Sequence, residues 1–174
     1  MLERKLVKHQ KRENLNEPDL WMLGDIERIK PSKYYHEIAK GDLYVAYREC
    51  DEWYNEIPIG EGLRSDCSMD YKGVRVHFEV DLGSEPMDDL FNKIENYIRH
   101  CPSGDKTIFV LRDGVRRTAR TTGNNLYAYL IDRKRGRQFS WTLLDMLKKD
   151  PFGEWLFNPL QDEPLTLDDL CSGS

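Results

Sequence analysis

The segment Gly73–Gly83 limits what this chain can fold into more than any other stretch of the sequence. Read with the two-residue period of a β-strand, it places apolar side chains on one face, namely Val74, Val76, Phe78, Val80 and Leu82. The other face carries Arg75, His77, Glu79 and Asp81. The sequence therefore predicts one long strand with one face in the core and a charged face that is either solvated or used for chemistry.

The charged face of this strand ends in two carboxylates. Glu79 and Asp81 project to the same side, about 7 Å apart along the strand, and two such acids repel each other unless a cation lies nearby. Mg²⁺ is the simplest candidate because it prefers carboxylate oxygens and water. The alternative is an edge strand whose charges prevent pairing with other chains. A zinc site built from His77, Glu79 and Asp81 is disfavoured, because alternate residues of one strand rarely supply three ligands to one tetrahedral centre.

The length and composition are typical of one globular domain. The chain has 174 residues, enough for a sizeable core with short extensions. It contains no apolar run near the roughly 18 residues of a membrane span, and no apolar stretch follows its basic N-terminus as in a signal peptide. The four cysteines are irregularly spaced without a C-x-x-C pair, which argues against a zinc ribbon and a disulfide scaffold. We therefore expect a cytoplasmic protein with no membrane contact.

The net charge of −5 conceals an uneven distribution of charge. From Arg112 to Lys149 there are ten basic and three acidic residues, which gives this block +7 and leaves −12 on the rest of the chain. After Lys149 there are six acidic residues and no basic one. A basic block on an acidic protein indicates a polyanion partner, and the acidic end offers a separate contact for a protein partner. A solvated surface without a partner is the alternative.

Hydrophobic periodicity predicts the order of the elements. Residues 1–35 are expected to form an N-terminal helical extension and residues 161–174 an acidic, disordered tail. Between them the pattern predicts a helix over 36–50, strands over 52–59, 64–71 and 73–83, a helix over 84–100, a strand over 107–111, a helix over 124–133 and a last strand over 139–147. Residues 107–111 form a short, largely apolar run, which is typical of a buried parallel strand. A helix that connects two parallel strands predicts an α/β (α+β) fold with a mixed central sheet flanked by helices.

This order of elements resembles the core of the PD-(D/E)XK nuclease-like, or restriction-endonuclease-like, fold. The resemblance sharpens at Asp66, which opens the second strand, and at Glu79 in Phe78-Glu79-Val80-Asp81. Within that superfold, the chain is most similar to the replication-relaxation family of plasmid, transposon and phage proteins. The similar stretches are His36–Ala46, Trp53-x-x-Glu56, Arg64-Ser65-Asp66, Phe78–Glu85 and Lys93-Ile94-x-x-Tyr97. They cover roughly residues 20–160 of the chain, with residues 36–160 as the nuclease-like domain and residues 1–35 as a candidate remnant of a winged helix.

The resemblance implies a metal-dependent site for phosphodiester hydrolysis. In such proteins the motif's aspartate and glutamate bind Mg²⁺, and a lysine two positions after the glutamate helps to activate water. Asp81 occupies that lysine position here, and Lys93 of the following helix is the candidate replacement. The resemblance carries the catalytic and metal-binding roles over to Asp66 and Glu79 alone. Lys93 and Glu56 are further candidate catalytic residues, and Asp81 is a further candidate metal ligand.

The basic block supplies candidate contacts to DNA. Arginine and lysine side chains suit phosphate oxygens, and tyrosine rings can stack on unpaired bases. The expected nucleic-acid-binding residues are Arg112, Arg116, Arg117, Arg120, Arg133, Lys134, Arg135 and Arg137. Together with this basic block, the resemblance implies a DNA-binding, nuclease-like protein of a mobile element, plasmid or phage. The activity it implies is that of a Mg²⁺-dependent endonuclease acting in DNA replication or transfer. The alternatives are a catalytically inactive DNA binder of the same fold and a protein-binding inhibitor or adaptor that uses the acidic surface.

Overall fold

The computed structural model describes residues 7–10, 20–23, 33–60, 62–131, 133 and 136–172. The chain divides into two compact units, residues 1–38 and residues 39–174. The strands are β1 (Val7–Gln10), β2 (Leu20–Leu23), β3 (Glu52–Asn55), β4 (Pro58–Gly60), β5 (Leu63–Arg64), β6 (Cys67–Tyr71), β7 (Val74–Asp81), β8 (Lys106–Leu111) and β9 (Phe139–Leu143). The helices are α1 (Tyr34–Ala46), α2 (Met87–His100), α3 (Ala119–Leu130), the 3-10 helix η2 (Gly136–Gln138), α4 (Leu144–Lys149) and α5 (Leu167–Ser172).

Residues 7–10 and 20–23 form strands, so the prediction of a helical extension over residues 1–35 is wrong for these two segments. β1 and β2 pair antiparallel, with Val7 opposite Leu23 and Gln10 opposite Leu20. The apolar run Leu20–Leu23 is too short for its period to distinguish a helix from a strand, and only pairing with a second segment decides between them. The other residues up to 32, and with them the winged-helix interpretation, lie outside the described residues.

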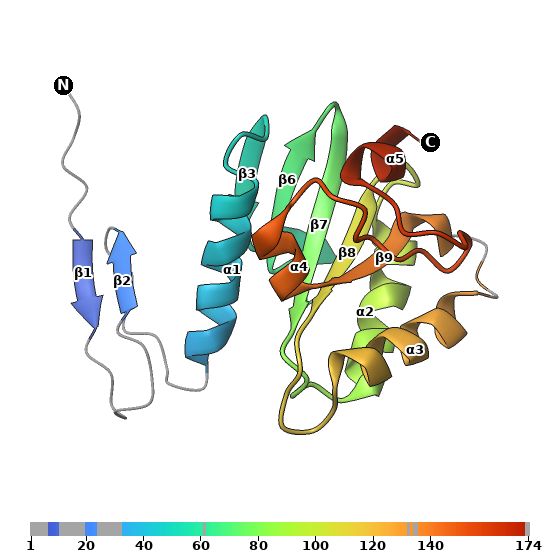
Figure 1. Cartoon of the computed structure of the whole chain (residues 1–174), viewed down its shortest axis with the longest axis horizontal. Helices are drawn as coiled ribbons and strands as arrows, with labels where there is room; N and C mark the ends of the chain where they lie inside the picture. The colour runs from blue at the N-terminus through green and yellow to red at the C-terminus, as the bar shows by residue number, and fades with distance from the viewer. Residues whose placement is uncertain are drawn as a thin grey trace. The chain divides into compact units, whose positions relative to one another are not determined.

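The second unit is built on a five-stranded sheet in the order β3-β6-β7-β8-β9 (Figure 1). β3, β6 and β7 form an antiparallel meander, whereas β8 and β9 run parallel to β7. Helix α2 makes the crossover from β7 to β8, as predicted. The predicted α/β (α+β) class with a mixed sheet flanked by helices is thereby confirmed.

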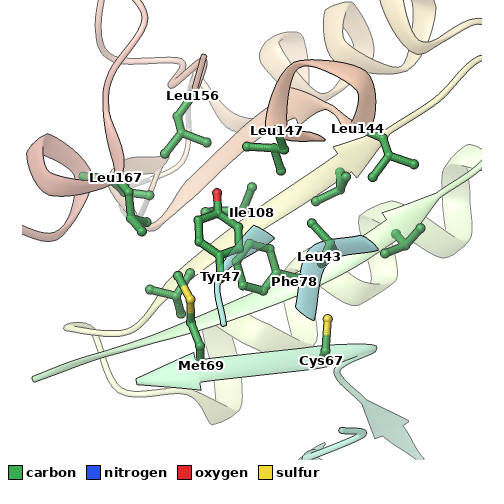
Figure 2. Close-up of a cluster of buried hydrophobic side chains, with 14 of the residues drawn as sticks. Leu43, Tyr47, Cys67, Met69, Phe78, Ile108, Leu144, Leu147, Leu156 and Leu167 are labelled. Atoms are coloured by element: carbon green, nitrogen blue, oxygen red, sulfur yellow. The ribbon is translucent and has the colours of Figure 1, made fainter. Parts of the chain in front are cut away.

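Each face of the sheet packs against its own set of helices. On one face, apolar side chains of β7 and β8 pack with the second half of α1 and with α4 and α5, and Figure 2 shows this cluster around Tyr47 and Phe78. On the other face, α2 and α3 bury a second cluster that includes Leu90, Ile94 and Phe109. β7 is therefore the central strand of a sheet that is covered on both sides. The predicted solvated face and the edge-strand alternative are both wrong, because from Val76 to Asp81 every residue of β7 is buried.

Local sequence signals place the ends of several elements correctly. Lys72 and Gly73 have positive φ angles of 50° and 79° and form the hairpin tip between β6 and β7, the geometry that favours glycine in a two-residue turn. The apolar stripe predicted over 84–100 is the buried side of α2. The strand predicted over 52–59 is instead broken into β3 and β4, because Glu56 adopts a φ of 52° that no regular strand contains.

The acidic C-terminal segment is folded, which corrects the expectation of a disordered tail. Leu167, Leu170 and Cys171 of α5 recur at helical spacing and are buried in the same cluster as β7 and β8. Thr166 and Asp169 cap the helix, since the Thr166 amide donates to Asp169 Oδ2 at 3.0 Å and the Asp169 amide donates to Thr166 Oγ1 at 3.1 Å. Residues 161–174 contain four acidic residues and no basic one, but three buried side chains decide the structure of this segment.

Truncation of one α5 leucine should measure what this helix contributes. We expect Leu170→Ala to lower the free energy of unfolding by about 2 kcal/mol, because it removes buried methyl groups and leaves a cavity. Urea unfolding followed by tryptophan fluorescence measures the change. Leu160→Ala is the matched control, since Leu160 is 42% exposed and its truncation should change stability by less than about 0.5 kcal/mol. Equal effects of the two substitutions would contradict the packing of α5 on the core.

In the described part of the chain, every helix is too short or too polar to cross a bilayer.

Candidate active site

The polar face of β7 is enclosed between the sheet and helices α2 and α3. His77, Glu79 and Asp81 are 3%, 1% and 2% exposed. Their register neighbours on β8 are Thr107, Phe109 and Leu111, of which the latter two belong to the cluster under α2 and α3. Buried carboxylates are costly unless they have partners, so the partners of Glu79 and Asp81 show what each residue does.

Glu79 is held by two side chains of α2. The Tyr97 hydroxyl donates to Oε1 at 2.6 Å, and the Lys93 ammonium lies 3.0 Å from Oε2. Lys93 and Tyr97 are four residues apart on the helix, so both point to the same place. Burial raises the pKa of Glu79 from 4.5 to about 7, with the negative charge of Asp66 adding to the effect and Lys93 opposing it.

Asp66 reaches the same place from the loop before β6. Its Oδ2 accepts a hydrogen bond of 2.7 Å from the backbone amide of Val80, the residue after Glu79. The two carboxylates are close enough for the charge of Asp66 to raise the pKa of Glu79. The structure thus brings together Asp66, Glu79 and Lys93, three of the four residues predicted to be catalytic.

Glu85 is a fourth member of this cluster that the sequence reasoning missed. It follows the turn at Gly83, and its Oε2 lies 3.0 Å from the Lys93 ammonium. Burial by itself lowers the pKa of Lys93, but the charges of Glu79, Glu85 and Asp66 outweigh burial and raise that pKa above its ordinary value. The sequence signal for Glu85 is its position just before a helix whose lysine borders the apolar stripe.

The cluster of Asp66, Glu79, Glu85 and Lys93 has the composition of a divalent cation site. Glu79 and Glu85 contact the Lys93 ammonium and the charge of Asp66 also acts on it, so three acids surround a single positive charge. Among the described residues, Glu79 Oε2 has no hydrogen bond of good geometry, although the Lys93 ammonium lies close to it. Carboxylate oxygens are the ligands that Mg²⁺ prefers. Asp66 and Glu79 thus offer oxygens of this kind side by side, as a magnesium site would need.

Asp81 and Glu56 have other partners. Asp81 Oδ2 forms a 2.6 Å ion pair with Arg117, and its Oδ1 accepts the Gly83 amide at 3.0 Å. Both Asp81 oxygens thus have partners within the protein, and its role as a metal ligand stays a prediction. The side chain of Glu56 is 56% exposed and lies 3.3 Å from the Lys40 ammonium and 4.0 Å from Arg64. The backbone of Glu56 contacts Asp66, since the Glu56 amide donates a 3.3 Å hydrogen bond to the Asp66 carbonyl.

The predicted phosphate-binding residues fall into three groups. Arg112, Arg116, Arg120 and Arg137 are exposed. Arg117 is only 10% exposed and forms an ion pair with Asp81, so most of its guanidinium is already engaged within the protein. Arg133 lies over the Tyr129 ring at 4.0 Å and pairs with Glu95 at 3.1 Å, while Lys134 and Arg135 lie outside the described residues.

A pocket of about 610 Å³ lies where β8 and β9 end and α3 begins. Arg112, Arg120 and Asn124 line it together with the aromatic rings of Trp141 and Phe157. Asp113 and Asp145 also line it, so its charge is mixed. The pocket thus combines two arginine side chains with aromatic surfaces.

Comparison with known proteins gives this chain no relative. No protein-family model, no curated protein sequence and no solved structure matches it.

Proposed function

We propose that this protein is a nuclease-like DNA-binding protein whose candidate catalytic centre consists of Asp66, Glu79 and Lys93. The observation that carries the proposal is that Glu79 and Glu85 each lie 3.0 Å from the Lys93 ammonium, while the charge of Asp66 also acts on it. A role in the replication or transfer of a mobile element, plasmid or phage, and a cytoplasmic location, rest on the resemblance and on the composition of the sequence.

Each residue of the centre has a separate task in this proposal. Asp66 and Glu79 would hold Mg²⁺, which supplies Lewis-acid polarisation of the phosphate and a more acidic bound water. The Tyr97 hydroxyl holds the Glu79 carboxylate in one orientation through its 2.6 Å hydrogen bond. Lys93 can place its positive charge beside a phosphate whose negative charge increases in the transition state. Because the Lys93 side chain is still 19% exposed, it can reach both Glu79 and a group arriving from solvent.

The pocket at the start of α3 supports binding of a nucleic acid strand. Arg112 and Arg120 offer charge to phosphate oxygens, and Trp141 offers an aromatic face to a base. Arg117 contributes indirectly, since its ion pair with Asp81 anchors the loop that carries Arg112 to the end of β7. These contacts are not specific for a base sequence, which suits a backbone-directed activity.

Nicking of supercoiled plasmid in Mg²⁺ or Mn²⁺ tests the proposal. We expect wild-type protein to nick the plasmid and to lose this activity in EDTA. Glu79→Gln and Asp66→Asn should each lower the rate about 100-fold or more, because each removes a charged metal ligand. Asp88→Asn is the matched control, since Asp88 is an exposed acid in the first turn of α2 and should leave the rate unchanged.

The other outcomes separate the alternatives. Nicking that persists in Glu79→Gln would place the activity elsewhere and contradict the proposed centre. An absence of nicking with every metal, together with DNA binding that weakens steeply between about 50 and 200 mM salt, would identify an inactive nuclease-fold DNA binder. A lack of DNA binding at low salt would leave only the protein-binding inhibitor or adaptor.

A further inference from the structure

The other half of the polar face of β7 carries a second cluster of metal-binding residues. His77 lies two residues before Glu79, Cys101 follows the last residue of α2, and Asp105 precedes β8. One donor atom from each residue lies within 4.8 Å of the other two. His77 Nε2 lies 3.4 Å from Asp105 Oδ2 and 3.9 Å from Cys101 Sγ. The three donors thus come from a strand, a helix end and a loop, and they meet at one nitrogen.

These separations suit a tetrahedral transition-metal ion. With zinc bonds of about 2.0 to 2.3 Å, the ligands of a tetrahedral site lie about 3.4 to 3.6 Å from one another. The distances from His77 Nε2 to Asp105 Oδ2, 3.4 Å, and to Cys101 Sγ, 3.9 Å, are close to these ligand–ligand distances. Small side-chain movements would therefore complete the site. Imidazole, thiolate and carboxylate are all ligands of Zn²⁺, whereas a thiolate disfavours Mg²⁺.

The histidine is oriented as a metal ligand requires. Its Nδ1 lies 2.8 Å from Ser68 Oγ, which in turn lies 2.9 Å from Ser65 Oγ. A hydrogen bond from Nδ1–H to Ser68 leaves the lone pair of Nε2 directed at Cys101 and Asp105, and such an outer hydrogen bond accompanies most metal-bound histidines. His77 and Ser68 are 3% and 0% exposed, so the orientation is fixed by packing.

The loop that supplies the other two ligands is also fixed. The Gln138 side-chain amide donates to the carbonyl oxygens of Pro102 at 2.8 Å and Asp105 at 3.1 Å. The Asp105 amide donates to the Pro102 carbonyl at 3.2 Å, which closes the turn. Cys101 and Asp105 are therefore held at both ends of a short loop and face His77.

A cysteine nucleophile activated by histidine does not explain this arrangement. In such a site the histidine uses one ring nitrogen for the cysteine and the other for the acid that orients it. Here the cysteine and the aspartate both approach Nε2, and Nδ1 is occupied by a serine. The Cys101 sulfur and the Asp105 carboxylate both lie near His77 Nε2, and such a meeting of three ligand atoms is typical of a metal site.

We propose that His77 Nε2, Cys101 Sγ and the Asp105 carboxylate form a Zn²⁺ site with a fourth position open to water. Binding converts the Cys101 thiol to the thiolate and releases its proton to the solvent. The ion would tie β7, the end of α2 and the start of β8 together. It would also lie beside Tyr97, whose ring centroid is 5.4 Å from that of His77 and whose hydroxyl positions Glu79.

Metal titration of the purified, metal-free protein tests the site. We expect one Zn²⁺ to bind per chain in competition with a chromogenic chelator. We also expect Co²⁺ to give visible d–d absorption and a thiolate-to-cobalt charge-transfer band. Cys101→Ser and His77→Gln should each weaken Zn²⁺ binding by about 100-fold or more, and Ser68→Ala by about tenfold through the loss of the outer hydrogen bond.

Two controls separate this site from other thiols and from the proposed catalytic centre. Cys50→Ser changes a partly exposed cysteine whose Sγ contacts the Glu52 carbonyl at 3.4 Å, and it should leave both the affinity and the charge-transfer band unchanged. Glu79→Gln should abolish nicking yet retain Zn²⁺. Absence of stoichiometric binding, or Zn²⁺ binding that survives Cys101→Ser, overturns the proposal. Because Cys101 is partly exposed, we expect Cys101→Ser to fold. Zn²⁺ binding by this variant can therefore be measured even if His77→Gln unfolds.

Discussion

Glu79→Gln is expected to stabilise the metal-free protein by about 3 kcal/mol at pH 8, although it removes a candidate catalytic group. Burial raises the pKa of Glu79 from 4.5 to about 7. In the unfolded chain the same carboxyl group ionises at its ordinary pKa, so between these pH values the unfolded state loses a proton that the folded state retains. The difference of about 2.5 pKa units corresponds to about 3 kcal/mol, because each unit is worth about 1.4 kcal/mol.

The direction of the pH dependence follows from the raised pKa. Below pH 4.5 the carboxyl group is protonated in both states, and the wild-type protein and Glu79→Gln should be equally stable. As the pH rises from 4.5 to about 7, the free energy of unfolding of the wild-type protein falls relative to that of Glu79→Gln. Above pH 7 the difference between the two free energies is constant. Urea unfolding in EDTA at a series of pH values measures this curve.

A control substitution and an added metal make this result specific. Glu154→Gln removes the charge of an exposed glutamate and should leave the pH dependence of the free energy of unfolding as it is in the wild-type protein. Mg²⁺ at pH 8 should reduce the difference in the free energy of unfolding between the two proteins. It should stabilise the wild-type protein and not Glu79→Gln, since only the ionised carboxylate binds the ion. A variant less stable than wild type at pH 8 would mean that the ion pair with Lys93 outweighs the cost of burying Glu79.

Arg117→Met is expected to lower the free energy of unfolding by about 3 to 5 kcal/mol, because it leaves the buried Asp81 carboxylate without its cation. Arg117 NH2 lies 2.6 Å from Asp81 Oδ2, and its Nε donates to Thr122 Oγ1 at 2.8 Å. The side chain thus connects the end of β7 to the first turns of α3. Thermal or urea unfolding at pH 7 measures the loss.

The neighbouring arginine supplies the matched control. Arg116 is exposed, so Arg116→Ala should change stability by no more than about 0.5 kcal/mol. The double variant Asp81→Asn with Arg117→Met should recover part of the loss, because it no longer buries an unpaired charge. If Arg117→Met and Arg116→Ala had the same effect on stability, the ion pair would contribute nothing measurable.

The local patterns of the sequence were sufficient for most of the central architecture. The period of two in β7, the apolar run of β8 and the helical stripe of α2 each reflect burial by neighbouring layers, and together they gave the mixed sheet and its crossover. Lys93 was named as the candidate replacement for the motif lysine because it lies on that following helix. The same reasoning failed for β2 and α5, whose short apolar segments acquire a structure only from the partner that covers them.

The sequence by itself determined that Glu79 and Asp81 lie on one face of a strand and that a lysine-bearing helix follows. Only the tertiary structure decided what each acid does, because that depends on partners distant along the chain. Arg117 neutralises Asp81 from the loop before α3, whereas Asp66 and Glu85 leave Glu79 in an anionic cluster. The meeting of His77 with Cys101 and Asp105 likewise depends on α2 returning the chain to the start of the parallel strand β8. Periodicity reports which side of an element is buried, and it contains no information on which residues meet there.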